Sequence, residues 1–111
     1  MTSQLTSTDL VTMAGAEGWS DTMDANQEIQ TICDQEKPQV QTMTGANYVD
    51  FKAVKYRNKS VRGGQNLIIK VFVGEDDYIH LSLYEPFDGK VQIRGVKQKR
   101  TKEDELTPFP N

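Results

Sequence analysis

Residue types that perform nucleophilic or metal chemistry are scarce in this chain of 111 residues, which has one cysteine, Cys33, and one histidine, His80. A thiol nucleophile needs a base beside it. Cys33 instead falls on a helical apolar stripe, which favours a small buried side chain. His80 stands between Ile79 and Leu81, as a strand-face residue would. One histidine and one cysteine do not favour a metal site, so we expect no catalytic residue, no metal and no cofactor.

Two charged clusters are also interpreted as solvated surface. Glu75-Asp76-Asp77 occupies a predicted turn, where a solvated turn is favoured over an acid–base pair. A basic cluster near the end of the chain could bind anions or act as a localisation signal. The acidic run 103–105 follows it directly, so a solvated strand end that resists edge pairing is favoured. That cluster consists of Lys97, Lys99, Arg100 and Lys102.

Apolar residues in turns are the more informative feature. The stretch 51–74 indicates two strands joined by a polar turn, with Val61 at its tip. A β-branched residue is unusual among the Gly, Asn and Ser that turns prefer. Val61 therefore either folds back onto the core or is held out for a partner. Trp19 and Phe87 raise the same alternatives, of core packing or contact with a partner.

The elements that position these residues begin with a helix predicted over residues 21–43. Ile29, Ile32, Cys33, Val40 and Met43 follow helical spacing. Asp21 and Asp24 are candidate N-terminal caps or first-turn acids. Pro38 is expected to kink the helix or remove a hydrogen bond, and Gly45 to end it.

Four strands are predicted to follow, at about 48–57, 66–73, 78–85 and 91–99, as an antiparallel meander. The turns at 58–65 and 86–89 are the first and third, so they lie at one end of the sheet. The turn at 74–77 lies at the other end. A helix antiparallel to the first strand would bring a trunk, residues 15–19, beside the first end. Trp19, Val61 and Phe87 would then form an apolar wedge.

Composition is consistent with one small α+β domain, residues 14–111, after a Thr/Ser-rich stretch, residues 1–13, which we expect to be a disordered extension or leader. The net charge of −3 argues against nucleic-acid binding. There is no apolar run of membrane-spanning length, so we expect no membrane partner. The single cysteine favours a reducing, cytoplasmic setting.

Four segments together resemble the stefins, the intracellular branch of the cystatins. They are EIQTICDQEKPQ in the helix, FKAVKY before the first turn, NLIIKVFVGEDDYIHL across the sheet and KEDELTPF near the end. The similarity covers about residues 15–109. It implies a cystatin-like fold, with one long helix wrapped by a five-stranded antiparallel sheet whose additional strand is the N-terminal trunk.

The resemblance also implies inhibition of papain-like cysteine proteases by a wedge of trunk, first hairpin and second hairpin. The stefin motif Gln-x-Val-x-Gly corresponds here to Lys59-Ser60-Val61-Arg62-Gly63, with Gly64 as an insertion. A register shifted by one residue, Ser60 to Gly64, loses the valine match. The second hairpin has Pro86-Phe87 in place of Leu-Pro and is about three residues shorter. The family's trunk glycine corresponds to Glu17 or Gly18.

We therefore expect a reversible, competitive inhibitor of cathepsin-type proteases, acting as a monomer, with a domain-swapped dimer as a further possibility that the resemblance implies. The alternative is a non-inhibitory or engineered cystatin-fold binding module for another partner, because the differences concentrate at the tips. The residues expected to contact the protease are Gly18, Trp19, Lys59, Ser60, Val61, Arg62, Gly63, Gly64, Pro86 and Phe87.

Overall fold

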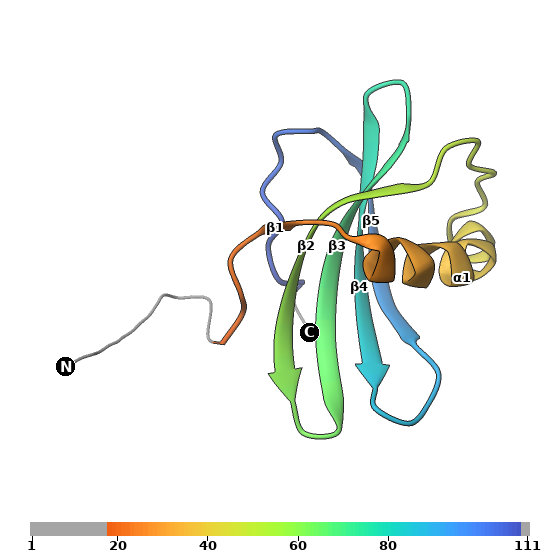
Figure 1. Ribbon diagram of the computed structural model, residues 1–111. Helices are drawn as coiled ribbons and strands as arrows, with labels where there is room; N and C mark the ends of the chain where they lie inside the picture. The colour runs from red at the N-terminus through yellow and green to blue at the C-terminus, as the bar shows by residue number, and fades with distance from the viewer. Residues whose placement is uncertain (1–17, 110–111) are drawn as a thin grey trace.

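A five-stranded antiparallel sheet and one helix make up residues 18–109, the part of the chain that the computed structural model describes (Figure 1). The strands lie in the order β1-β2-β3-β4-β5, so each strand pairs with its neighbour in sequence. This confirms the predicted α+β class. The elements are β1 (Met23–Asp24), α1 (Gln27–Thr44), β2 (Lys52–Val61), β3 (Gly64–Gly74), β4 (Asp77–Pro86) and β5 (Gln92–Arg100).

The helix begins later than residue 21. Asn26 is its N-cap, because its side-chain Oδ1 accepts from the amide of Ile29 at 3.0 Å. The expectation that Asp21 or Asp24 caps the helix is therefore wrong, and Asp24 instead belongs to β1. Pro38 lies inside the helix, which continues to Thr44. As predicted, Gly45 ends it in the left-handed conformation, with φ of 77°.

The additional strand is β1, which has only two residues. Met23 pairs with Tyr56 and Asp24 with Lys55. The prediction that residues 21–43 form the helix and that the extra strand lies in the trunk before it is therefore wrong at this point. The predicted leader, residues 1–13, and the first part of the trunk, residues 15–17, lie outside the described residues.

The core lies between one face of the sheet and α1. Ile29, Ile32, Cys33 and Val40 are buried on the helix. They pack against alternate residues of the strands, which period-two alternation directs to the same face. Met43 is 49% exposed and so departs from the predicted stripe. The strand residues in this core are Ala53, Leu67, Ile69, Val71, Ile79, Leu81 and Leu83.

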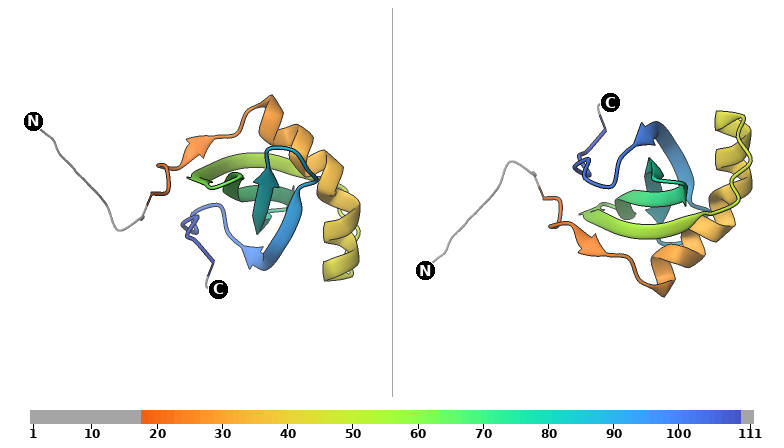
Figure 2. Two further views of the ribbon diagram at one scale, coloured as in Figure 1. Left: turned by 90° about the horizontal axis from the view of Figure 1, so that it is seen from below. Right: turned by 90° about the horizontal axis from the view of Figure 1, so that it is seen from above.

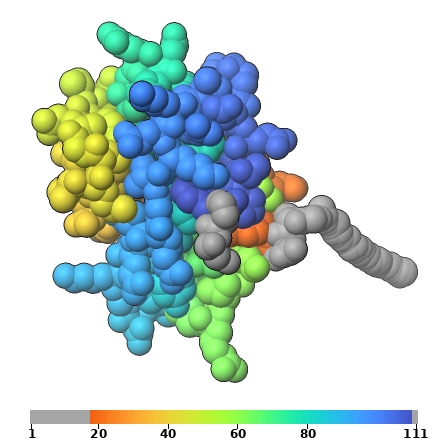
Figure 3. Space-filling model, turned by 180° about the vertical axis from the view of Figure 1, so that it is seen from behind, coloured from red at the N-terminus to blue at the C-terminus, as the bar shows by residue number. Residues whose placement is uncertain are grey.

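The C-terminal tail, residues 101–109, covers the opposite face of the sheet. Figure 2 shows α1 and the tail on opposite sides, and Figure 3 shows the tail lying over the back of the strands. Leu106 is 4% exposed and Ile68 on this face is fully buried. Lys70 Nζ donates to the backbone carbonyls of Lys102 and Asp104, at 2.7 and 2.6 Å. These contacts fix the tail against the sheet.

Candidate functional site

The first hairpin is tighter than predicted. Strands β2 and β3 pair as far as Val61 and Gly64, so only Arg62 and Gly63 form the turn. The expected turn at 58–65 was too long because polar residues 58–60 continue the ladder. Val61 is half-buried at the end of β2 and is not at the tip, which the exposed Arg62 and Gly63 occupy. Gly63 has φ of 85°, a conformation that favours glycine.

Gly64 allows the second hairpin to approach the first. A Cβ at this position would lie 2.2 Å from the carbonyl oxygen of Glu85 and 2.8 Å from Cα of Pro86. No side chain fits in that space without backbone movement. The close approach at this glycine is between β3 and β4, two neighbouring strands of the same sheet.

Phe87 projects from the second hairpin into solvent. Its side chain is 82% exposed, although Pro86, directly before it, still pairs with Gly64 in the sheet. Of the two alternatives that the sequence left open, coverage of the core is excluded. An exposed phenylalanine on an ordered turn is available to a partner.

The trunk is tied to the end of β2 that leads into the first hairpin. The amide of Ser20 donates to the carbonyl of Asn58 at 2.8 Å, and the amide of Asn58 donates to Ser20 Oγ at 3.0 Å. A Cβ built on Gly18, whose φ is 93°, would lie 3.5 Å from Cε of Lys59. Trp19 stands between these two contacts and is half-buried.

The structure thus brings the three predicted segments together. Both hairpin turns lie at one end of the sheet, and the β3–β4 turn lies at the other (Figure 1). We call this end the tip edge and define it by the trunk residues Gly18 and Trp19, the first-hairpin residues Lys59, Ser60, Val61, Arg62, Gly63 and Gly64, and the second-hairpin residues Pro86 and Phe87.

Cys33 and His80 cannot form a nucleophile–base pair, because the sheet separates them. Cys33 is fully buried against the helix-facing core. Burial raises the pKa of its thiol to about 12. His80 lies on the tail-covered face, where burial and then the charges of Lys70, Arg100 and Lys97 lower its pKa to about 4. No group of three His, Cys, Asp or Glu among the described residues could hold a metal ion.

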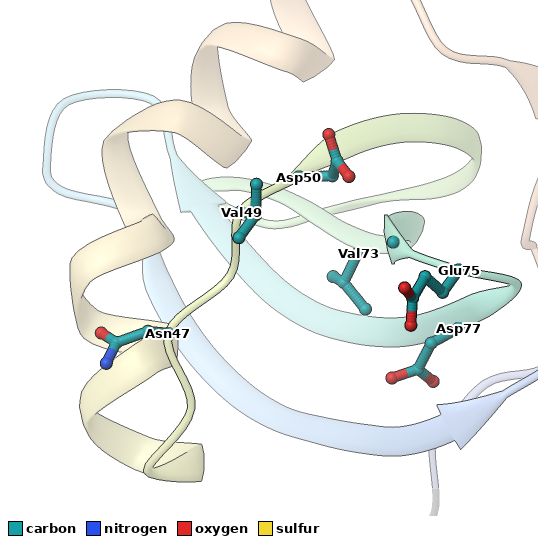
Figure 4. Close-up of a pocket in the computed structure, with 7 residues that line it drawn as sticks. Asn47, Val49, Asp50, Val73, Glu75 and Asp77 are labelled. Atoms are coloured by element: carbon teal, nitrogen blue, oxygen red, sulfur yellow. The ribbon is translucent and has the colours of Figure 1, made fainter.

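A hollow of about 500 Å³ lies at the opposite end of the sheet from the tip edge. Figure 4 shows Glu75 and Asp77 beside Val73 on one wall, and Val49 and Asp50 on the segment facing them. Val49 is 94% exposed. Glu75 and Asp77 are exposed, as expected of a solvated turn, and Val49 is an exposed apolar residue remote from the tip edge.

The residues that hold the trunk in place leave no pattern in the sequence. Arg57 lies on the tail-covered face, since it is paired with the fully buried Ile68. Its Nε donates to the carbonyl of Ser20 at 2.8 Å, and one terminal guanidinium nitrogen donates to the carbonyl of Leu106 at 2.9 Å. Strand alternation indicates the face of Arg57, but no local pattern identifies partners so distant in sequence.

Comparison with known proteins identifies the class of this fold. The model of the cystatin domain matches residues 18–107. Stefin-C of Bos taurus is 42% identical over 95 residues, which cover 83% of this chain and 93% of the relative. Cystatin-A of Homo sapiens is 36% identical over 95 residues, which cover 83% of this chain and 96% of that relative. Leukocyte cysteine proteinase inhibitor 1 of Sus scrofa is 35% identical over 97 residues, which cover 85% of this chain and 93% of that relative.

The chain therefore belongs to the cystatin family, and its similarity to stefins is confirmed. Family membership also confirms that it is not an enzyme. Among the described residues, no helix has the length and apolar character needed to span a membrane.

Proposed function

We propose that the protein is a reversible, competitive inhibitor of papain-like cysteine proteases of the cathepsin type, which occludes the active-site cleft with the tip edge. The observation that carries this proposal is the mutual fixation of three segments. Ser20 and Asn58 join the trunk to the first hairpin, and Phe87 and Gly63 join the two hairpins. A relative that is named as a cysteine proteinase inhibitor supports the same assignment.

Occlusion by this edge needs no chemistry from the inhibitor. Phe87 supplies an exposed aromatic contact. Val61 and Trp19 are half-buried, and the exposed part of each side chain adds apolar surface. Aromatic side chains are enriched among interface residues that dominate binding energy. Because the turns are ordered before binding, little conformational entropy is lost on association. Substrate and inhibitor then compete for the same cleft.

Two cations at the edge bear on which protease is preferred. Lys59 and Arg62 replace uncharged residues of the stefin motif, and Arg62 is exposed on the turn. An unpaired charge buried in an interface would cost several kcal/mol, so both must stay solvated or find partners. We expect weaker binding than by a stefin with the full motif, and a preference for proteases whose cleft has an acidic rim.

The experiment is a titration of the purified monomer against papain and a cathepsin with a fluorogenic substrate. We expect competitive inhibition at nanomolar to low micromolar concentration. Phe87→Ser should raise the inhibition constant at least tenfold. Val49→Ser removes an apolar side chain that is still more exposed, at the opposite end of the sheet, and should leave the inhibition constant unchanged. Equal effects of the two substitutions would contradict the assignment of the tip edge.

The second candidate is a cystatin-fold binding module without inhibitory activity, natural or engineered. Arg62 on the first turn favours this candidate, because a bulky cation stands where the stefin motif has a small residue. The same titration separates the two functions. A folded monomer that leaves both proteases uninhibited at tens of micromolar would support the binding module.

We infer that the active form is a cytoplasmic monomer, supported by the resemblance to stefins and by the single, buried cysteine. A domain-swapped dimer would straighten the Arg62-Gly63 turn, since exchange about residues 59–64 makes β2 and β3 continuous. Size-exclusion chromatography before and after mild heating tests this exchange. An unchanged monomer peak would count against it.

A further inference from the structure

Arg57, on strand β2, contacts segments near both ends of the described chain. Its half-buried side chain donates to the carbonyl of Ser20 in the trunk and to that of Leu106 in the tail, at 2.8 and 2.9 Å. These partners are 37 and 49 positions away in sequence. In Figure 3 the tail lies over the back of the sheet, with the trunk and first hairpin next to it.

On the trunk side, the contact lies next to the tip edge. Ser20 follows Trp19 directly and is held at its amide, its hydroxyl and its carbonyl: the first two by Asn58 and the third by Arg57. Because three groups of Ser20 are held, the backbone orientation of Trp19, directly before it, is restricted. Arg57 and Asn58 together therefore set the position of Trp19.

On the tail side, the contact rests on a rigid support. Leu106 is 4% exposed, and the tail before it is held by the two bonds from Lys70. Arg57 therefore has one end of its guanidinium anchored to a fixed carbonyl while Nε holds the trunk. A planar guanidinium with five N–H donors suits two carbonyls in different directions, whereas a lysine ammonium is a single point on a flexible stem.

We propose that Arg57 is a positioning residue for protease binding: by joining Ser20 to Leu106 it holds Trp19 in line with the two hairpins without touching the protease. The inference rests on the proposed function and adds a determinant outside the tip edge. Its consequence is that part of the inhibitor's affinity depends on the docked tail, because the tail supports the guanidinium that fixes the trunk.

The first readout needs no protease. Trp19 is the only tryptophan in the chain, so its fluorescence reports on the trunk alone. We expect Arg57→Gln to raise the acrylamide quenching constant of Trp19 at least 1.5-fold while the far-ultraviolet circular dichroism spectrum stays unchanged. Lys99→Gln, which removes an exposed positive charge from β5, is the matched control and should leave the quenching constant unaltered.

The second readout is a double-mutant cycle on the inhibition constant. Arg57→Gln is expected to weaken inhibition about tenfold in the chain that carries Trp19. In the Trp19→Ala background the same substitution should weaken it less than threefold, because the positioned side chain is gone. Arg57→Lys keeps the charge and most of the stem. This variant should fold even if Arg57→Gln does not. We expect it to weaken inhibition at least fivefold, which is half of the effect of Arg57→Gln.

The outcomes separate the positioning role of Arg57 from the proposed function. Full inhibition by Arg57→Lys would show that charge alone suffices and would overturn the positioning role. Additive effects of Arg57→Gln and Trp19→Ala, with unchanged quenching of Trp19, would also overturn it. If the unaltered chain inhibits neither protease, the proposed function fails, whatever the quenching measurements give.

Discussion

The backbone amide of Phe87 donates a hydrogen bond to the carbonyl oxygen of Gly63, with 2.9 Å between nitrogen and oxygen. This bond joins Phe87, the exposed aromatic residue of the second hairpin, to the turn of the first. Because Gly64 and Pro86 are paired beside it, the two turns behave as one unit. A change at this junction should therefore affect both hairpins together.

Gly64→Ala tests that junction. A methyl group would lie 2.2 Å from the carbonyl oxygen of Glu85, so the backbones must separate. We expect the free energy of unfolding to fall by about 1–3 kcal/mol, the usual cost of overpacking, and inhibition to weaken. Urea titration and the protease assay measure the two effects. Lys52→Ala, at an exposed position of β2 far from the tip edge, is the control. Wild-type stability of Gly64→Ala would contradict the close approach.

Val61→Asp tests the apolar contribution of the first hairpin. Val61 is half-buried at the end of β2, so a carboxylate there remains solvated in the free protein. In a protease cleft it would lose that solvation. We expect inhibition to weaken at least tenfold, with little change in the thermal midpoint. Val49→Asp at the opposite end should do neither. Undiminished inhibition by Val61→Asp would exclude the proposed hairpin contact.

His80 should make stability depend on pH. Burial, then Lys70, Arg100 and Lys97, lower its pKa from 6.5 to about 4, while Asp104 opposes them. The fold therefore favours the neutral imidazole. Its stabilisation is complete above pH 6.5 and is lost as the pH falls toward 4, by at most about 3 kcal/mol at 1.36 kcal/mol per pKa unit. The urea midpoint of the wild-type chain should fall across this window.

His80→Gln provides the comparison for that pH dependence, because its amide stays neutral throughout. The pKa values of Asp24 and Asp104 are lowered from 3.8, by a hydrogen bond from Lys55 and by hydrogen bonds from Thr101 respectively, so both carboxylates stay charged in this window. We expect the urea midpoint of His80→Gln to vary less with pH between 6.5 and 4. Parallel curves for the two proteins would rule out His80 as the source.

The β3–β4 turn offers a stabilising substitution. Glu75 and Asp76 both have positive φ, at 48° and 63°, as the central residues of a type I′ turn do. Glycine adopts that conformation without the steric cost that a side chain incurs. Asp76→Gly should raise the free energy of unfolding by about 1 kcal/mol. A lower thermal midpoint for this variant would show that the Asp76 side chain contributes more than its backbone strain costs.

Much of this fold was predictable because its determinants are local. Alternation along Ile79, Leu81 and Leu83 and the helical spacing of Ile29 and Cys33 correctly identified the core. The helix start was missed because Asn26 competes with two nearby aspartates that are equally good caps. The length of the first turn was missed because polar residues can extend a ladder as well as end it. These errors lie at element boundaries, where propensity is weakest.

The candidate site was predictable in outline only. Chain order and turn spacing placed the trunk and the two hairpins together, while the exposure of Phe87 and the half-burial of Val61 depended on packing across strands. Arg57 was not identifiable, since its partners Ser20 and Leu106 belong to segments without regular structure. Contacts from side chains to distant backbone carbonyls leave no periodic signal in a sequence.

The reach of the Arg57 side chain also bears on the order in which the chain folds. The β2–β3 ladder closes across a turn of two residues, but the bonds of Arg57 close loops of 37 and 49 positions. Longer loops cost more entropy to close and are formed later. The hairpins should thus form first, and the two ends of the chain should pack against the sheet last. A folding chain would have both turns in place before Trp19 reaches its final position.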